Sequence, residues 1–224
     1  MMTDKNAAVE SHARFKRNFI LLSPLLLTAS NYVTARLSAH FLGRWAWVPL
    51  QIEYWAMLTA ILAFCGGWTV LRQGYRRPTH WGWWIPCLLV GLTPLPVLLL
   101  NRGLMREPLL IASWLAIALV NPFFEETYWR GLFGEVTQSW PALLACVYPT
   151  LFFAFGHPLG LGVFSIGCRS RDMLVALIVM GLVWSYTYRR TRSLQAITFS
   201  HMLVDFFNMS VWVYMNILIP KSSL

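Results

Sequence analysis

The sequence predicts an all-α membrane protein, a polytopic bundle of about seven transmembrane helices, and three observations support this class. Apolar residues make up 57% of the 224 residues and charged residues only 12%, whereas soluble domains carry about 25% charged residues. Long charge-free segments recur along the chain, and a helix needs about 20 apolar residues to cross a bilayer. Basic residues gather in the short connections between these segments, as they do in membrane proteins.

Seven apolar segments are the expected spans. The last of them is interrupted only by Asp205. The long fifth segment contains Pro149, Pro158 and several glycines, so one helix followed by a re-entrant stretch is an alternative that raises the count to eight. The segments are residues 18–35, 54–71, 78–101, 108–124, 136–168, 173–188 and 193–220. Residues 1–17 are expected to form a polar cytoplasmic tail, and residues 18–220 a single transmembrane domain with its functional core at about 108–219.

The basic residues between the spans favour a cytoplasmic N-terminus. In that orientation more of them lie on the cytoplasmic side, as the positive-inside rule prefers. The cytoplasmic set is Lys5, Arg14, Lys16, Arg17, Arg72, Arg76, Arg77, Arg189, Arg190 and Arg192, and the outer set is Arg36, Arg44, Arg102, Arg106, Arg169, Arg171 and Lys221. The net charge of +9 is then explained by membrane anchoring, and no nucleic-acid partner is expected.

The segment NPFFEETYWR, residues 121–130, places ionisable side chains in an apolar region. A charged group near the bilayer centre costs roughly 2.5–3.5 kcal/mol on insertion scales, so these residues need compensation or a function. Glu126 and Arg130 are one helical turn apart, in the favourable order for an ion pair. Glu125 lies about 100° around the helix from Glu126 and is left over from this pairing. Pro122 favours an irregular, hydrated cavity beside Glu125. The alternative is that both glutamates lie at a helix end and face water.

Two further apolar segments carry polar residues at helical spacing. In FFAFGHPLG, residues 152–160, Phe153 and His157 are one turn apart, and Pro158 predicts that His157 lies at a kink or a helix end. In SHMLVDFFN, residues 200–208, the polar residues at i, i+4 and i+7 share one helix face; they are His201, Asp205 and Asn208.

These groups come from three spans and together suit the hydrolysis of a peptide bond. A carboxylate in a low-dielectric cavity can act as a general base, and with a histidine it can polarise a water against a carbonyl. A second histidine, with an amide or a protonated acid, can donate to the developing oxyanion. Two alternatives remain at this point, a proton relay in a transporter and a non-catalytic membrane scaffold or immunity protein. A transporter would show an internal repeat, and none is found in the sequence.

The three segments carry a family resemblance. EETYWR (125–130), FAFGH (153–157) and HMLVD (201–205) match the patterns EExxxR, FxxxH and HxxxN/D in that order. The sequence resembles the CPBP family of CAAX-processing and bacteriocin-processing intramembrane proteases, related to the Ras-converting CAAX endoprotease of eukaryotes. The resemblance covers the second half of the chain, and the first three spans match only in being hydrophobic.

The resemblance implies an intramembrane glutamic-type endopeptidase in which Glu125 and His157 activate water. His201 and the residue at 205 would form the oxyanion site. The implied supporting residues are Glu126, Arg130, Phe153 and Asn208. The prenyl-protease members favour asparagine where this sequence has Asp205, and a carboxylate cannot donate to an oxyanion unless it is protonated. Asp205 is therefore expected to accept a hydrogen bond from His201 and to orient that imidazole.

The remaining expectations concern the substrate, the location and the cofactor. The small size resembles the bacterial members, so we expect a multi-pass protein of the bacterial inner membrane that cleaves a membrane-associated protein or peptide. A C-terminal sorting or anchor signal is the expected kind of substrate. No cofactor or metal is expected. Zinc is the alternative, because two histidines and two carboxylates could hold it, although the HExxH motif is absent and the histidines lie on different helices.

Overall fold

The computed structural model describes residues 2–77 and 80–210, and over these residues it is helical with no β-strand. The all-α prediction is confirmed for this part of the chain, while the end of the predicted span 193–220 lies outside the described residues. The helices are α1 (Met2–Leu42), α2 (Trp47–Cys65), α3 (Gly67–Arg76), α4 (Trp84–Leu92), α5 (Leu95–Asn101), α6 (Pro108–Glu126), α7 (Phe133–Val136), α8 (Ala142–Leu159), α9 (Arg171–Thr191) and α10 (Gln195–Phe207).

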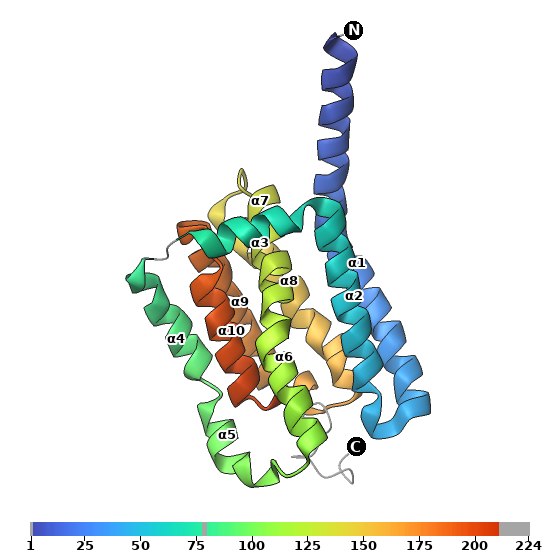
Figure 1. Ribbon diagram of the computed structural model, residues 1–224, viewed down its shortest axis with the longest axis vertical. Coiled ribbons are helices and arrows are strands. Elements are labelled where there is room, and N and C mark those ends of the chain that lie inside the picture. Colours follow the sequence, from blue (N-terminus) through green and yellow to red (C-terminus); the bar gives the residue numbers. More distant parts are fainter. Residues whose placement is uncertain (1, 78–79, 211–224) are drawn as a thin grey trace.

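Most helices lie roughly along one direction, and α3 lies across one end of the bundle (Figure 1). α10 packs against α4 on one side and α6 on the other, α8 packs against α9, and α1 pairs with α2. The N-terminal part of α1 extends beyond the rest of the bundle (Figure 1). This packing places α10, which carries the last motif, beside α6, which carries the first.

Four helical stretches within the described residues are long and apolar enough to cross a membrane: Trp47–Cys65, Trp81–Leu104, Pro108–Val136 and Ala142–Val163. The predicted count of seven spans is not confirmed. In the long segment 136–168, α8 is followed by two short 3₁₀ turns, Leu161–Val163 and Gly167–Arg169.

The predicted span 54–71 is wrong at both ends. α2 begins earlier, because Glu53 is accommodated inside the helix, where it accepts a hydrogen bond from Ser30 Oγ of α1 at 2.5 Å. α2 ends earlier because Gly66 adopts the left-handed conformation with φ of 81°, which glycine enters at little cost. The chain then turns into α3, whose faces differ strongly in polarity. A charge-free segment therefore does not define a helix.

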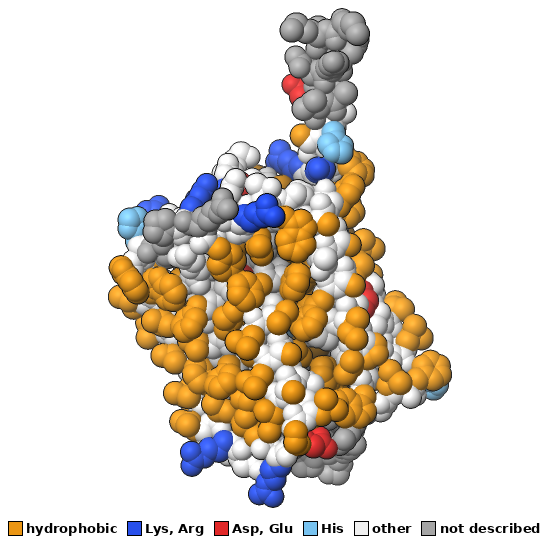
Figure 2. All heavy atoms as spheres, viewed as in Figure 1, with side chains coloured by type: hydrophobic (Ala, Val, Ile, Leu, Met, Phe, Trp, Pro, Cys, Tyr) orange, Lys and Arg blue, Asp and Glu red, His pale blue; other side chains and the backbone are white. Residues whose placement is uncertain are grey.

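The outer surface is that of a membrane protein. Figure 2 shows hydrophobic side chains covering the middle of the visible face, with Lys and Arg side chains gathered toward its upper and lower ends. Many large apolar side chains are exposed, among them Leu89, Leu109 and Leu143. Such an apolar band between two basic rims matches the hydrocarbon layer between its headgroup regions. The chain is an integral membrane protein.

The backbone becomes irregular directly after the paired glutamates. Pro122 lies buried inside α6, and the helix continues past it to Glu126. Residues Thr127–Leu132 then form a π-helical turn in which every residue is buried. The extra residue in such a turn changes the direction of the side chains that follow, and π-helical turns occur frequently at functional sites.

Candidate active site

The carboxyl end of α6 holds the two glutamates in the protein interior. Glu125 is 4% exposed and Glu126 is 0% exposed, which excludes the alternative that both face water. Arg130 Nη1 donates to Glu126 Oε1 at 2.9 Å, so the predicted ion pair is present. The Arg130 guanidinium carbon also lies 4.5 Å from the centre of the Phe153 ring and 5.0 Å from that of Trp184. Cation–π attraction therefore adds to the ion pair in holding this buried charge.

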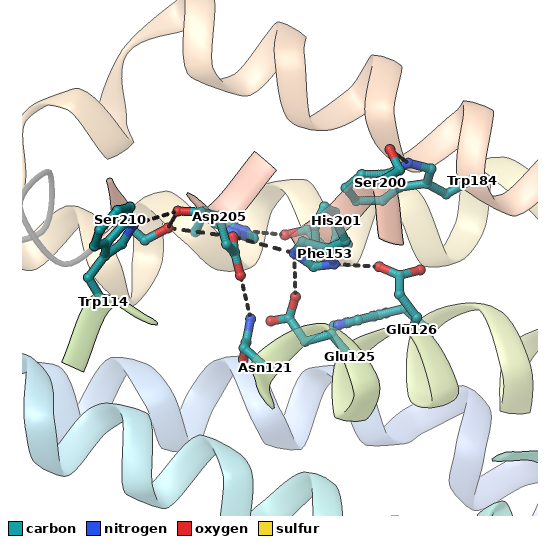
Figure 3. A network of polar contacts seen from close by, with 12 residues as sticks. Trp114, Asn121, Glu125, Glu126, Phe153, Trp184, Ser200, His201, Asp205 and Ser210 are labelled. Atoms are coloured by element: carbon teal, nitrogen blue, oxygen red, sulfur yellow. Dashed lines mark hydrogen bonds and ion pairs between the residues drawn. The ribbon is translucent and has the colours of Figure 1, made fainter. Parts of the chain in front are cut away.

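His201 of α10 lies among three carboxylates. Its Nδ1 lies 2.6 Å from Glu126 Oε1, and its Nε2 lies 3.4 Å from Glu125 Oε2 and 3.6 Å from Asp205 Oδ1 (Figure 3). The ring is stacked on Trp184, with 4.7 Å between the ring centres. These contacts correct the expectation that Glu125 is left over, and they give Glu126 a second partner besides Arg130, because His201 contacts both glutamates.

His157 lies in the last turn of α8, at the predicted helix end. Its Nδ1 lies 2.7 Å from the carbonyl oxygen of Phe153. Since a carbonyl only accepts, Nδ1 carries the proton, and Nε2 of the neutral ring is left as an acceptor. The Phe153 ring contacts His157 and His201 edge-on, with centres 4.9 and 6.2 Å away. The backbone at position 153 thus sets the tautomer of His157, and the Phe153 ring packs against both histidines.

One cavity of about 60 Å³ brings these side chains together, with Glu125, His157, His201 and Asp205 in its wall. The volume is several times the roughly 10–15 Å³ that one buried water requires. Side chains of α1, α2, α6, α8 and α10 line the cavity. The predicted convergence of the three motifs on one cavity is therefore present in the structure.

Asn121 is a residue of this site that the sequence analysis missed. Its Nδ2 donates to Asp205 Oδ2 at 3.5 Å, and its Oδ1 accepts from Trp55 Nε1 at 2.9 Å and from Gln51 Nε2 at 3.2 Å. Asn121 lines the same cavity and is buried. One signal was available, since Asn121 is one helical turn before Glu125 on an otherwise apolar face.

Tyr54 of α2 was missed as well. Its hydroxyl donates to the Glu125 carboxylate and accepts from Trp129 Nε1 at 3.1 Å. A tyrosine in an apolar helix is common, so nothing in the sequence distinguished this one.

Two further expectations concern Asn208 and a bound metal ion. Asn208 is half-buried just beyond α10 and is not among the residues that line the cavity. Across residues 2–77 and 80–210, no group of three or more His, Cys, Asp or Glu side chains is arranged to hold a metal ion. The Nδ1 atoms of both histidines are already in hydrogen-bond contact with protein oxygens.

Comparison with known proteins finds a similarity in the second half of the chain. No curated protein and no solved structure matches the sequence. A family model described as type II CAAX prenyl endopeptidase Rce1-like matches residues 107–207. The matched region runs from the start of α6 to the end of α10 and contains Glu125, His157, His201 and Asp205, whereas Tyr54 and Gln51 lie outside it. Residues 107–207 therefore match the Rce1-like family of CAAX proteases.

Proposed function

We propose that this protein is an intramembrane glutamic-type endopeptidase that hydrolyses a peptide bond of a membrane-associated substrate. The observation that carries the proposal is the single cavity into which α6, α8 and α10 bring a carboxylate and two histidines. Hydrolysis of an amide needs a base for water, a donor for the oxyanion and a proton for the leaving amine. The cavity holds a candidate for each.

Glu125 and His157 are the proposed water-activating pair. Glu125 takes a proton from the water as the water oxygen attacks the carbonyl carbon, and His157 Nε2 accepts the second hydrogen bond of that water. The tetrahedral intermediate collapses when the C–N bond breaks, and the proton on Glu125 passes to the leaving nitrogen. Tyr54, which donates to Glu125, keeps the carboxylate turned toward the cavity in this proposal.

His201 and the amide of Asn121 are the proposed oxyanion donors. When both ring nitrogens are protonated, His201 donates through Nδ1 to Glu126 and presents Nε2–H to the cavity. Asp205 cannot donate as a carboxylate, but Asn121 contacts it and supplies a neutral amide at this place. We infer that Asn121 and Asp205 together do what a single asparagine would do at position 205.

The proposed substrate is a C-terminal sorting or anchor segment of a protein in a bacterial inner membrane. The N-terminus is proposed to lie in the cytoplasm. The excess of basic residues in the connections assigned to the cytoplasm supports this orientation.

The test uses the full chain reconstituted in liposomes. Two fluorogenic peptides serve as probes, one ending in a farnesylated cysteine followed by three residues and one ending in an apolar anchor helix. We expect the wild type to cleave the anchor peptide, and Glu125→Gln to lower the rate by about 10²–10⁴-fold while the protein stays folded. Glu10→Gln, the same change at an exposed site near the start of α1, is the matched control. Cleavage of neither probe by the wild type, or an active Glu125→Gln variant, would contradict the proposal.

A further inference from the structure

Part of the cavity wall comes from α1, α2, the end of α8 and the 3₁₀ turn that follows it. Apolar side chains on this wall come from Leu27, Leu50 and Leu161. Two glycines, Gly156 and Gly160, complete it. This part of the cavity has no role in the proposed chemistry.

Gly156 leaves space directly beside His157. A Cβ atom built at Gly156 meets no heavy atom within 4 Å outside its own helical surroundings. The backbone is helical there, so neither its conformation nor crowding requires glycine. At Gly181, by contrast, a Cβ would lie 2.6 Å from Thr150 Cγ2, and glycine permits helix packing. The absent side chain at Gly156 therefore adds volume to the cavity.

Residues of α1 and α2 lie beside the second glycine, Gly160. A Cβ at Gly160 would lie 3.7 Å from Asn31 Cβ and 3.8 Å from Leu50 Cδ2, which is ordinary contact. Asn31 Oδ1 is buried and has no hydrogen-bond partner among the described residues, and Asn31 lines the cavity. A buried acceptor without a partner is costly. Because the oxygen itself is inaccessible, the Asn31 amide would turn toward the cavity to accept a peptide N–H that enters it.

We propose that this end of the cavity is a subsite for one apolar side chain of the substrate next to the cleaved bond, and that Gly156 sets the largest side chain it accepts. The inference rests on the proposed function and adds a substrate class to it, a peptide with an apolar residue at that position. Asn31 accepts a main-chain N–H of the same peptide. The leucine wall gives affinity by covering the apolar side chain.

The experiment reduces the space in the subsite by adding a side chain at Gly156, without destabilising α8. Gly156→Ala and Gly156→Leu place better helix formers at a helical position. The probes are anchor peptides that differ only in the residue on one or the other side of the cleaved bond, which is Ala, Val, Leu or Phe. Gly82→Ala is the control, because its Cβ also meets nothing within 4 Å and Gly82 is exposed and outside the cavity.

We expect wild type and Gly82→Ala to share one profile that favours a large apolar residue. Gly156→Ala should lower kcat/KM for the Leu and Phe peptides by about 10-fold or more relative to the Ala peptide, and Gly156→Leu should lower it further. Peptide binding is measured in the Glu125→Gln background as a rise in unfolding temperature. In that background, Gly156→Leu should abolish the rise in unfolding temperature caused by the Leu peptide. The rise caused by the Ala peptide should remain.

The two readouts separate the subsite from the chemistry. Cleavage by the wild type with unchanged profiles in both Gly156 variants overturns the subsite and leaves the proposed function standing. The expected change in binding selectivity without any cleavage supports the subsite and overturns the proposed function. Binding of no peptide in the series overturns the subsite.

Discussion

At the residue scale, one carboxylate oxygen organises the site. Glu126 Oε1 is 2.9 Å from Arg130 Nη1 and 2.6 Å from His201 Nδ1, and all three side chains are buried. Arg130 comes from the same helical turn, whereas His201 is 75 residues away. Glu126 therefore joins the first motif to the last.

Glu126→Gln should lower stability strongly. A neutral amide leaves the buried Arg130 guanidinium without its carboxylate partner, and breaking a buried ion pair costs about 3–5 kcal/mol. We expect a lower unfolding temperature in detergent, together with weaker cleavage, because His201 loses its anchor. Glu125→Gln should unfold close to the wild-type temperature.

The control for this variant is Glu135→Gln. Glu135 pairs with Arg192 at a partly exposed position, and such pairs contribute only about 0–1 kcal/mol. If Glu126→Gln and Glu135→Gln both unfold at the wild-type temperature, the organising role assigned to Glu126 is wrong.

The contact between Asn121 and Asp205 can be tested by exchanging the two side chains. Asn121→Asp alone would place two carboxylates about as close as the present 3.5 Å contact, and like charges in a low dielectric repel strongly. We expect that variant to lose most activity. The double variant Asn121→Asp/Asp205→Asn restores one amide and one carboxylate, so it should recover a large part of kcat/KM. A double variant as inactive as Asn121→Asp would show that the two positions do not act as a unit.

At the element scale, the position of α10 depends on its fit against α4. A Cβ at Gly91 of α4 would lie 3.0 Å from the carbonyl oxygen of Ser200 and 3.2 Å from its Cα. Ser200 Oγ donates to the Cys87 carbonyl at 2.6 Å and accepts from Trp184 Nε1 at 3.0 Å. Since Ser200 directly precedes His201, this contact sets the depth of the imidazole.

Gly91→Ala should therefore move α10. Backbone cannot shift as a flexible side chain does, so the added methyl group should cost about 1–3 kcal/mol and reduce cleavage by displacing His201. Thermal unfolding and kcat/KM are the measurements. Gly82→Ala, which adds the same methyl group in open space, should change neither, and equal behaviour of the two variants would contradict this account of the α4–α10 contact.

At the scale of the whole molecule, the chain alternates between two ends of the bundle. The connection after α7 lies at the same end as α3, and the connection between α5 and α6 lies at the opposite end (Figure 1). Exposed positions are available at both, Ser139 at the first end and Gly103 at the second.

Single cysteines at these positions test the proposed orientation. We expect a membrane-impermeant maleimide to label Gly103→Cys on intact bacterial cells and to label Ser139→Cys only after permeabilisation. The unmodified chain is the blank, since Cys87, Cys146 and Cys168 are buried and Cys65 is half-buried. Labelling of Ser139→Cys alone on intact cells would reverse the orientation.

The sequence by itself determined what depends on neighbours along the chain. The apolar composition and helical spacing predicted an all-α membrane protein, the i,i+4 spacing predicted the pairing of Glu126 with Arg130, and Pro158 predicted a helix end at His157. The first follows from the composition of the chain, and the other two follow from backbone geometry within one or two turns.

Only the tertiary structure decided the features that require a partner on a distant helix. Glu53 stays inside α2 because Ser30 of α1 donates to it, which no count of charges can reveal. Tyr54 and Asn121 become parts of the site because Glu125 and Asp205 lie beside them, and His201 shares Glu126 with Arg130 because α10 packs against α6. A buried polar group is stabilised by whatever partner packing brings to it, and the packing of helices depends on the shapes of whole faces rather than on any short segment of sequence.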